Sequence, residues 1–174
     1  AFAVMNALFQ REQTGLGQQV EAALLETAVS LLNYHAEGYL LTGNVPGRLG
    51  SSHPSVAPYR NFKCRDGQYV FIAAANDRLW GRLCKGLGFE PLTEDPRFKS
   101  NLDRVQHRAE LDAIVAEAVG RHDMEPLLKC LDEAGVPAAP VSTVDRIMRE
   151  PQVEHRGMVQ TAVQVGPDTR HGDD

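Results

Sequence analysis

A hairpin signal followed directly by a helix start constrains the fold of this chain more than any other feature. Residues 62–65 and 69–74 are strand-like segments on either side of Asp66-Gly67, a dipeptide typical of type I′ turns. Asn76-Asp77 then offers a cap for the helix that follows. Because so short a turn can join only antiparallel strands, this part of the chain is predicted to contain both a small sheet and helices.

Most of the sequence after the hairpin indicates short helices that end at glycine or proline. Residues 103–119 and 124–134 carry apolar side chains at helical spacing, and Arg104 and Asp112 fall on the side where we expect solvent. The remaining expected segments are an extended stretch at 136–141, a short helix from Ser142 that Pro151 ends, a helical turn at 153–157 and a strand at 159–165.

The first part of the chain is apolar on all sides. Residues 1–11 therefore predict a buried helix. Residues 18–41 fit helical spacing, although their first six residues fit a strand equally well, and Gly43 is expected to close the helix. The chain starts in mid-pattern without an initiator Met, from which we expect a piece of a larger protein.

Composition narrows the class of protein. Hydrophobic residues make up 43% of the 174 residues and charged residues 24%, which are ordinary globular values. The net charge of -5 gives no basic patch, so we expect neither nucleic acid nor a membrane surface as partner. The three cysteines (Cys64, Cys84 and Cys130) lie far apart and indicate reduced, structural thiols in a cytoplasmic protein. The histidines have no metal-ligand spacing, and no metal or prosthetic group is expected.

These patterns predict the α+β class and three parts. Residues 1–46 are expected to be a helix-rich end of a larger α/β domain, including a long linker helix. Residues 47–158 are expected to be a small α+β domain with a short antiparallel sheet and packed helices, and residues 159–174 a return strand and tail.

A glycine- and serine-rich loop precedes the hairpin. Gly50, Ser51 and the neighbouring small residues offer N–H groups that can approach a thioester or carboxylate closely and stabilise a developing oxyanion. The same composition also fits a plain linker, just as Asn76 also fits a plain helix cap.

The order of the motifs decides between these interpretations. The loop continues into His53-Pro54 and Ala57-Pro58-Tyr59, and the hairpin and the Asn76 helix start follow. This order resembles the family III CoA-transferases (the CaiB/BaiF family), in which this stretch reads close to G-N-x-H-P-x-x-A-P-Y; Ser51 stands where Asn is common. Three further segments typical of that family support the resemblance: residues 14–18 (TGLGQ), 135–137 (GVP) and 150–153 (EPQV).

The resemblance implies an enzyme that moves CoA between carboxylic acids, with an acyl-CoA thioester as substrate. In that family an aspartate attacks the thioester, giving an acyl anhydride and then an enzyme–CoA thioester. The resemblance puts the aspartate before Ala1, so we assign no catalytic residue in this chain and expect the chain alone to be inactive. It also implies Gly50, Ser51, His53 and Asn76 as substrate-binding residues and an interlocked homodimer. For the first part of the chain it implies a Rossmann-like large domain, with a strand at residues 18–23 followed by a long helix.

Two alternatives remain open at this point. An acyl-CoA racemase of the same family would need acid/base groups to move an α-proton. Such racemases place a glutamate where this chain has Asn76, and an amide cannot do that work. The other alternative is a non-catalytic interaction domain with the same fold.

Overall fold

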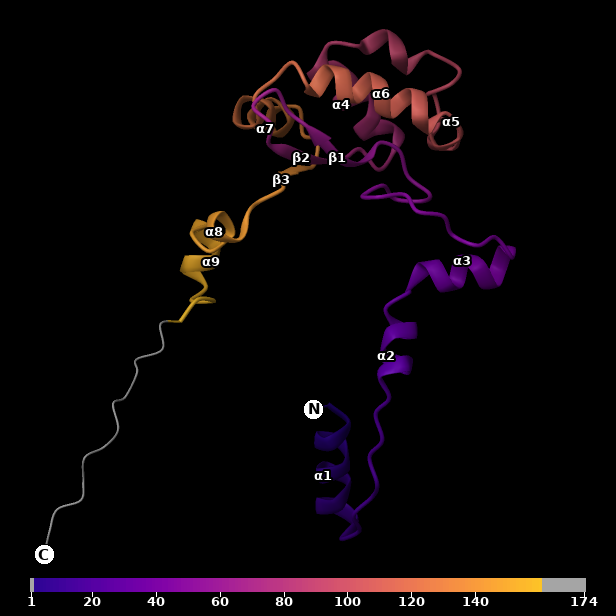
Figure 1. Ribbon diagram of the computed structural model, residues 1–174, viewed down its shortest axis with the longest axis vertical. Coiled ribbons are helices and arrows are strands. Elements are labelled where there is room, and N and C mark those ends of the chain that lie inside the picture. The colour runs from indigo at the N-terminus through magenta and orange to yellow at the C-terminus, as the bar shows by residue number, and fades with distance from the viewer. Residues whose placement is uncertain (1, 161–174) are drawn as a thin grey trace, which may run out of the picture. The chain divides into compact units, whose positions relative to one another are not determined.

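The computed structural model describes residues 2–160 and divides the chain into two units, residues 1–48 and 49–174 (Figure 1). The first unit is helical, and the second combines helices with a three-stranded antiparallel sheet. The predicted α+β class is thereby confirmed.

The first unit contains α1 (Phe2–Thr14), α2 (Leu24–Ser30) and α3 (Tyr34–Thr42). Two expectations for this unit are wrong: residues 18–23 form no strand, and the expected long helix is two helices. The division lies at Asn33, which has a φ of 47°, and an L-residue in that conformation cannot continue a right-handed helix. Gly43 ends α3 with a φ of 72°, as predicted.

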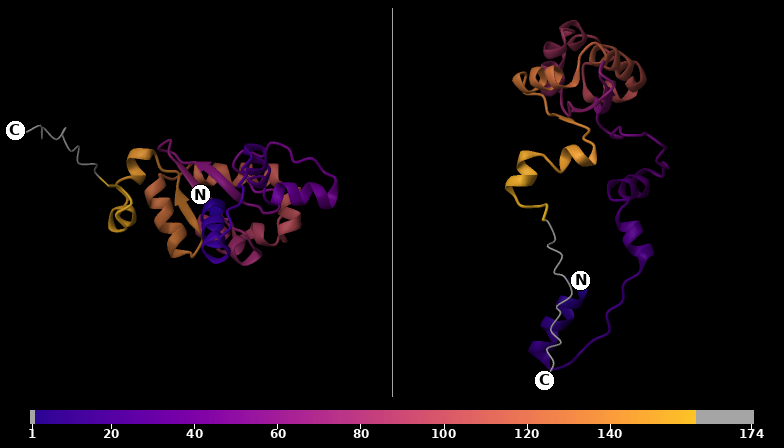
Figure 2. Two further views of the ribbon diagram at one scale, coloured as in Figure 1. Left: turned by 90° about the horizontal axis from the view of Figure 1, so that it is seen from below. Right: turned by 60° about the vertical axis from the view of Figure 1, so that its left-hand side comes forward.

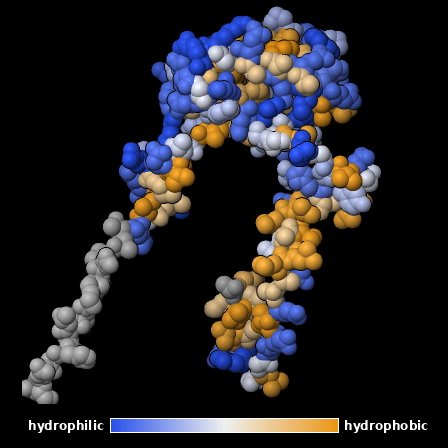
Figure 3. Space-filling model, in the orientation of Figure 1, coloured by the Kyte–Doolittle hydropathy of each residue, from blue (hydrophilic) through white to orange (hydrophobic). Residues whose placement is uncertain are grey.

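The predicted burial of the first helix is also wrong. Residues 2–14 do form a helix, but none of them is buried, and Phe2 is 81% exposed. Figure 3 shows hydrophobic residues gathered over α1 and α2. An apolar sequence gives a buried helix only where another element covers it, and none of the described residues covers α1.

The sheet of the second unit consists of β1 (Tyr59–Lys63), β2 (Tyr69–Ala73) and β3 (Ala138–Pro140), in the order β1-β2-β3. The predicted hairpin is confirmed, but its type I′ turn is wrong. Only Gly67 in the turn has a positive φ, at 83°, and its N–H donates to Cys64 O. The Asp66 carboxylate accepts the N–H groups of Gln68 and Met124, and these bonds hold a longer loop than the two-residue turn.

Helices form at the positions predicted for this unit, but one of the expected helices is divided. The expected helix at 103–119 is two helices, because a capping box between Ser100 and Asp103 starts one helix and His107 separates it from the next. Of the predicted strand at 159–165, residues 159–160 have no regular structure and the rest lie outside the described residues. The helices are α4 (Asp77–Leu87), the 3-10 helix η1 (Glu90–Thr93), α5 (Asn101–Gln106), α6 (Arg108–Val119), α7 (Met124–Glu133), α8 (Val144–Ile147) and α9 (Pro151–His155).

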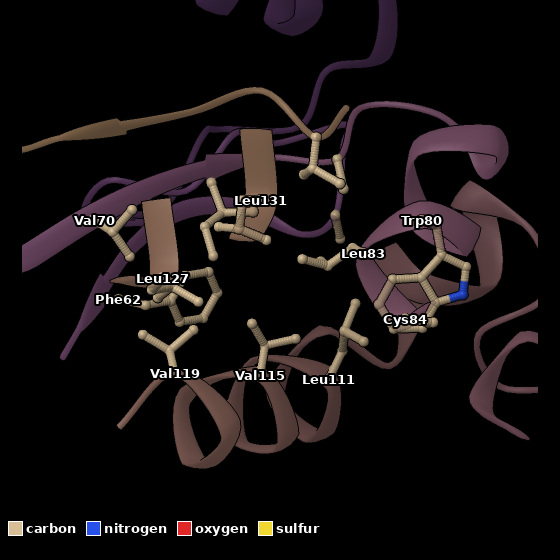
Figure 4. Packing of buried hydrophobic residues seen from close by; sticks show 14 of the residues in the cluster. Phe62, Val70, Trp80, Leu83, Cys84, Leu111, Val115, Val119, Leu127 and Leu131 are labelled. Atoms are coloured by element: carbon tan, nitrogen blue, oxygen red, sulfur yellow. The ribbon is translucent and has the colours of Figure 1, made fainter. Parts of the chain in front are cut away.

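The core lies between one face of the sheet and helices α4, α6 and α7 (Figures 1 and 2). Alternate residues of the paired strands point inward, as Phe62 and its partner Val70 do. In Figure 4, Leu111, Val115 and Val119 of α6 point into the core at the spacing of one helix face, with Val119 on the side of Phe62 and Leu111 on the side of Cys84. This core fixes the sheet end and the α4 start on which the candidate site is built.

Two charged residues expected in solvent are instead buried. Asp112 is 9% exposed and Arg104 is fully buried. Asp112 Oδ2 accepts a 2.7 Å hydrogen bond from Arg60 Nη1 on β1, so a cross-element ion pair offsets part of the cost of its burial.

Candidate functional site

The sheet brings the glycine loop and Asn76 to the same end of the hairpin. Tyr59, the first residue of β1, pairs with Ala73, the last residue of β2. The N–H of Ala74 extends this pairing by donating to Pro58 O at 3.1 Å. Because the strands are antiparallel, the loop that enters β1 and the turn that leaves β2 must lie beside each other.

The loop itself folds back onto β1. Gly50 has a φ of 61°, a conformation that favours glycine, and it turns the chain toward the strand. Ser51 Oγ accepts the N–H of Asn61 at 3.1 Å. The N–H of His53 donates to Tyr59 O, and the His53 ring meets the Tyr59 ring edge-on with centroids 5.4 Å apart. Gly50 and Ser51 are exposed and His53 is half-buried, so a ligand can reach this segment.

Three side chains from α5 and α6 hold the backbone of residues 54–57. Asn101 accepts the N–H of Ala57 and donates to Ser55 O, at 3.3 and 2.8 Å. Arg108 donates to Val56 O and Pro54 O, at 3.2 and 3.1 Å. Arg104 donates to Ala57 O from Nε at 2.8 Å. The loop therefore has a fixed backbone although it lacks regular structure.

Asn76 is the N-cap of α4, as predicted. Its Oδ1 accepts the N–H of Leu79 at 2.9 Å, while the residue stays exposed. Because a backbone donor occupies the oxygen, the group that Asn76 still presents to a ligand is its side-chain NH₂.

The structure places His53 and Asn76 at the end of the sheet where β1 begins and β2 ends, and it places Ser51, next to Gly50, beside Asn61 in the middle of β1. Asn101 and Arg108 were not predicted as supporting residues, and Arg104 was expected in solvent. In a single predicted helix their spacing of three and four residues puts them on one side, but a polar side normally indicates solvent.

The acidic groups near the site are already paired. Asp77 accepts a 2.7 Å bond from Arg104, and Asp112 is paired with Arg60. Burial raises the pKa of the Cys84 thiol to about 12, and it also raises the pKa of Cys64. Both thiols therefore stay protonated at neutral pH and are unsuited to nucleophilic attack.

The described part of the chain has neither a metal-ligand cluster nor a membrane-spanning helix. Among residues 2–160, no cluster of three or more His, Cys, Asp or Glu side chains is arranged to hold a metal ion. Within the same range, none of the helices has the length and hydrophobicity needed to cross a membrane.

Comparison with known proteins identifies the family. The model of CoA-transferase family III matches residues 1–170. The chain belongs to CoA-transferase family III. A relative from Fusarium pseudograminearum (strain CS3096), named acyl-CoA transferase, is 38% identical over 90% of the chain and 34% of its own length. The succinate–glutarate CoA-transferase of Agrobacterium fabrum (strain C58 / ATCC 33970) is 32% identical over 90% of the chain and 39% of its own length.

A solved structure extends the family relationship to the fold. The crystal structure of a CaiB/BaiF family protein from Brucella suis superimposes with a TM-score of 0.76 at 35% identity, over 95% of this chain and 46% of that one. The chain thus spans 34% to 46% of the length of the family III relatives named here.

Proposed function

We propose that the protein transfers CoA between a CoA thioester and a free carboxylic acid, and that this chain supplies the substrate loop. The observation that carries the proposal is the family match over residues 1–170. In the overall exchange the C–S bond of the donor breaks and a thioester forms on the acceptor carboxyl group. With an aspartate as nucleophile, the donor acyl group leaves as a carboxylate that carries one aspartate oxygen, and the aspartate regains an oxygen from the acceptor carboxylate, so no water is consumed.

The geometry supports a role in holding the substrate. The Ser51 hydroxyl accepts from the Asn61 N–H, and its own proton is free to be donated to an anionic oxygen. The side-chain NH₂ of Asn76, at the turn that follows β2, is a second donor. Donors fixed in this way stabilise a carboxylate or a developing oxyanion without having to reorganise during the reaction.

The nucleophile is proposed to be an aspartate that is not among the residues of this chain. Asp77 and Asp112, two acidic residues near the loop, each have an oxygen engaged in an ion pair with an arginine, so neither is assigned as the nucleophile. Asn76 also lacks the acid/base group that a racemase needs, so transfer is favoured over racemisation.

The substrate class proposed first is a short dicarboxylic acid, with succinyl-CoA as donor. The name of the Agrobacterium fabrum relative, succinate–glutarate CoA-transferase, is the reason for this choice. We also propose that the protein is a cytoplasmic homodimer. Exposed apolar side chains on all three helices of the first unit, among them Phe2, Leu24 and Leu40, support association with another chain.

The test uses the protein with any sequence that its gene encodes on either side of this chain. It is incubated with succinyl-CoA and single carboxylic acids in D₂O, and acyl-CoA species are followed by mass spectrometry. New acyl-CoA that depends on the acceptor supports transfer and names the substrate. Deuterium at Cα of a branched acyl-CoA, without any acceptor, overturns transfer in favour of racemisation.

A further inference from the structure

Arg104 is a fully buried arginine that the substrate-binding proposal does not use. It lies on α5, and its side chain is 0% exposed. A buried guanidinium is costly unless its N–H groups are bonded. Here Nε donates to Ala57 O at 2.8 Å, Nη1 to Phe98 O at 3.0 Å, and Nη2 to Asp77 Oδ1 at 2.7 Å.

These bonds reach both halves of the candidate site. Ala57 ends the loop that carries Gly50, Ser51 and His53. Asp77 is the first residue of α4 and follows Asn76 directly. One rigid planar group therefore ties the loop backbone to the start of α4, 20 residues further along the chain.

The surroundings of Arg104 keep this group in a single orientation. Its Cζ lies 5.6 Å from the ring centroid of Trp80, one turn into α4. Nη1 donates to the carbonyl oxygens of Phe98 and Lys99, which lie in the segment that precedes α5. Lysine has a single ammonium on a flexible stem, so it cannot reproduce three directions of donation at once.

We propose that Arg104 is a positioning residue, which holds the loop of residues 50–57 and the Asn76 turn at a fixed separation for substrate binding. This inference rests on the proposed function. Donors on separate segments can bind one substrate tightly only while their spacing is held, because a displacement of about 1 Å can lower a rate roughly 100-fold.

The first test measures coupling in the 174-residue chain, without any substrate, by amide hydrogen exchange. The probes are the N–H of Ala57 in the loop and of Leu79 in α4, and Ala134 N–H, bonded to Cys130 O in α7, is the reference. R104K is expected to speed exchange at Ala57 and Leu79 at least tenfold more than at Ala134. R121K, which alters an exposed pair with Glu117, is the matched control and should change none of them.

Removal of a buried cation can unfold the domain, so D77N serves as the milder variant. The Asp77 side chain is 64% exposed, and its replacement leaves Arg104 bonded to Ala57 and Phe98. We expect D77N to speed exchange at Ala57 at least threefold, although the two residues share no direct hydrogen bond. Faster exchange at Leu79 alone, or an equal change at Ala134, would show that Arg104 only stabilises the domain and would overturn the proposal.

The second test measures transfer by the gene product with its flanking sequence. R104K should lower kcat at least tenfold, whereas R121K should leave kcat and KM unchanged. If R104K keeps its full activity, the positioning role is refuted. If the unaltered protein transfers no CoA to any acid, the proposed function fails instead, while the exchange experiment still decides whether Arg104 couples the two segments.

Discussion

Substitutions at Asn76 separate its role as a helix cap from its proposed role as a substrate donor. Its Oδ1 caps α4 through the Leu79 N–H, whereas its NH₂ is the group left for a substrate. Serine and aspartate keep an acceptor oxygen at the cap and lose the NH₂. Alanine loses both groups, so N76S, N76D and N76A form an internally controlled series.

The expected magnitudes follow from these two contacts. Loss of the cap in N76A should lower the free energy of unfolding by about 1 kcal/mol, while N76S and N76D stay within about 0.5 kcal/mol of the unaltered chain. Loss of one hydrogen bond to a charged group is worth roughly 1.5–3 kcal/mol. At about 1.4 kcal/mol per factor of ten, all three variants should lose roughly 10- to 150-fold in kcat/KM. N76D should lose most, because its carboxylate repels an anionic acceptor.

The stability assay is urea unfolding of the 174-residue chain, followed by fluorescence. Trp80 is the single tryptophan and is only 2% exposed, so its emission reports unfolding of the second unit. Activity is measured as acyl-CoA formation by the gene product with its flanking sequence. Full activity in N76S would refute the donor role, and equal stability of N76A and N76S would refute the cap argument.

Two further predictions concern the folded chain itself. A hydrogen bond from the Met124 N–H holds the pKa of Asp66 below its usual range, and a hydrogen bond from Arg65 does the same for the pKa of Asp123. A carboxylate whose pKa is lowered in the folded state stabilises the fold above its unfolded pKa of about 4, and this stability is lost as the pH falls further. D66N should therefore lose less stability than the unaltered chain between about pH 5 and pH 2 in urea titrations. Equal losses in the two chains would contradict this prediction. Light scattering should also show that the chain self-associates. The triple variant L24Q/L40Q/L41Q should weaken this association, because these three leucines are 90%, 80% and 86% exposed. If the unaltered chain is a monomer at high concentration, the prediction is wrong.

The predictions were correct for features whose conformation is set by neighbouring residues. Gly43 ends α3 in the left-handed region, and Asn76 caps α4, because each effect operates within one turn. The apolar spacing of Leu111, Val115 and Val119 likewise marked the buried face of α6.

The predictions were wrong where a residue far away in the sequence determines whether a side chain is buried or which turn forms. Arg104 and Asp112 looked like solvent-facing charges, because a helical pattern does not reveal that Asp77 and Arg60 lie opposite them. The turn at Asp66 was mistaken for a two-residue turn, because its carboxylate also bonds the start of α7, 58 residues away.

The sequence by itself determined the family, the α+β class and the four residues proposed to face the substrate, because local motifs in a fixed order specify these features. Only the tertiary structure decided how those residues are held together. Strand pairing places the loop beside Asn76, and the buried Arg104 ties Ala57 to Asp77. The physical reason is that burial and hydrogen bonding of a charge depend on groups far away in the chain, which only folding brings within reach.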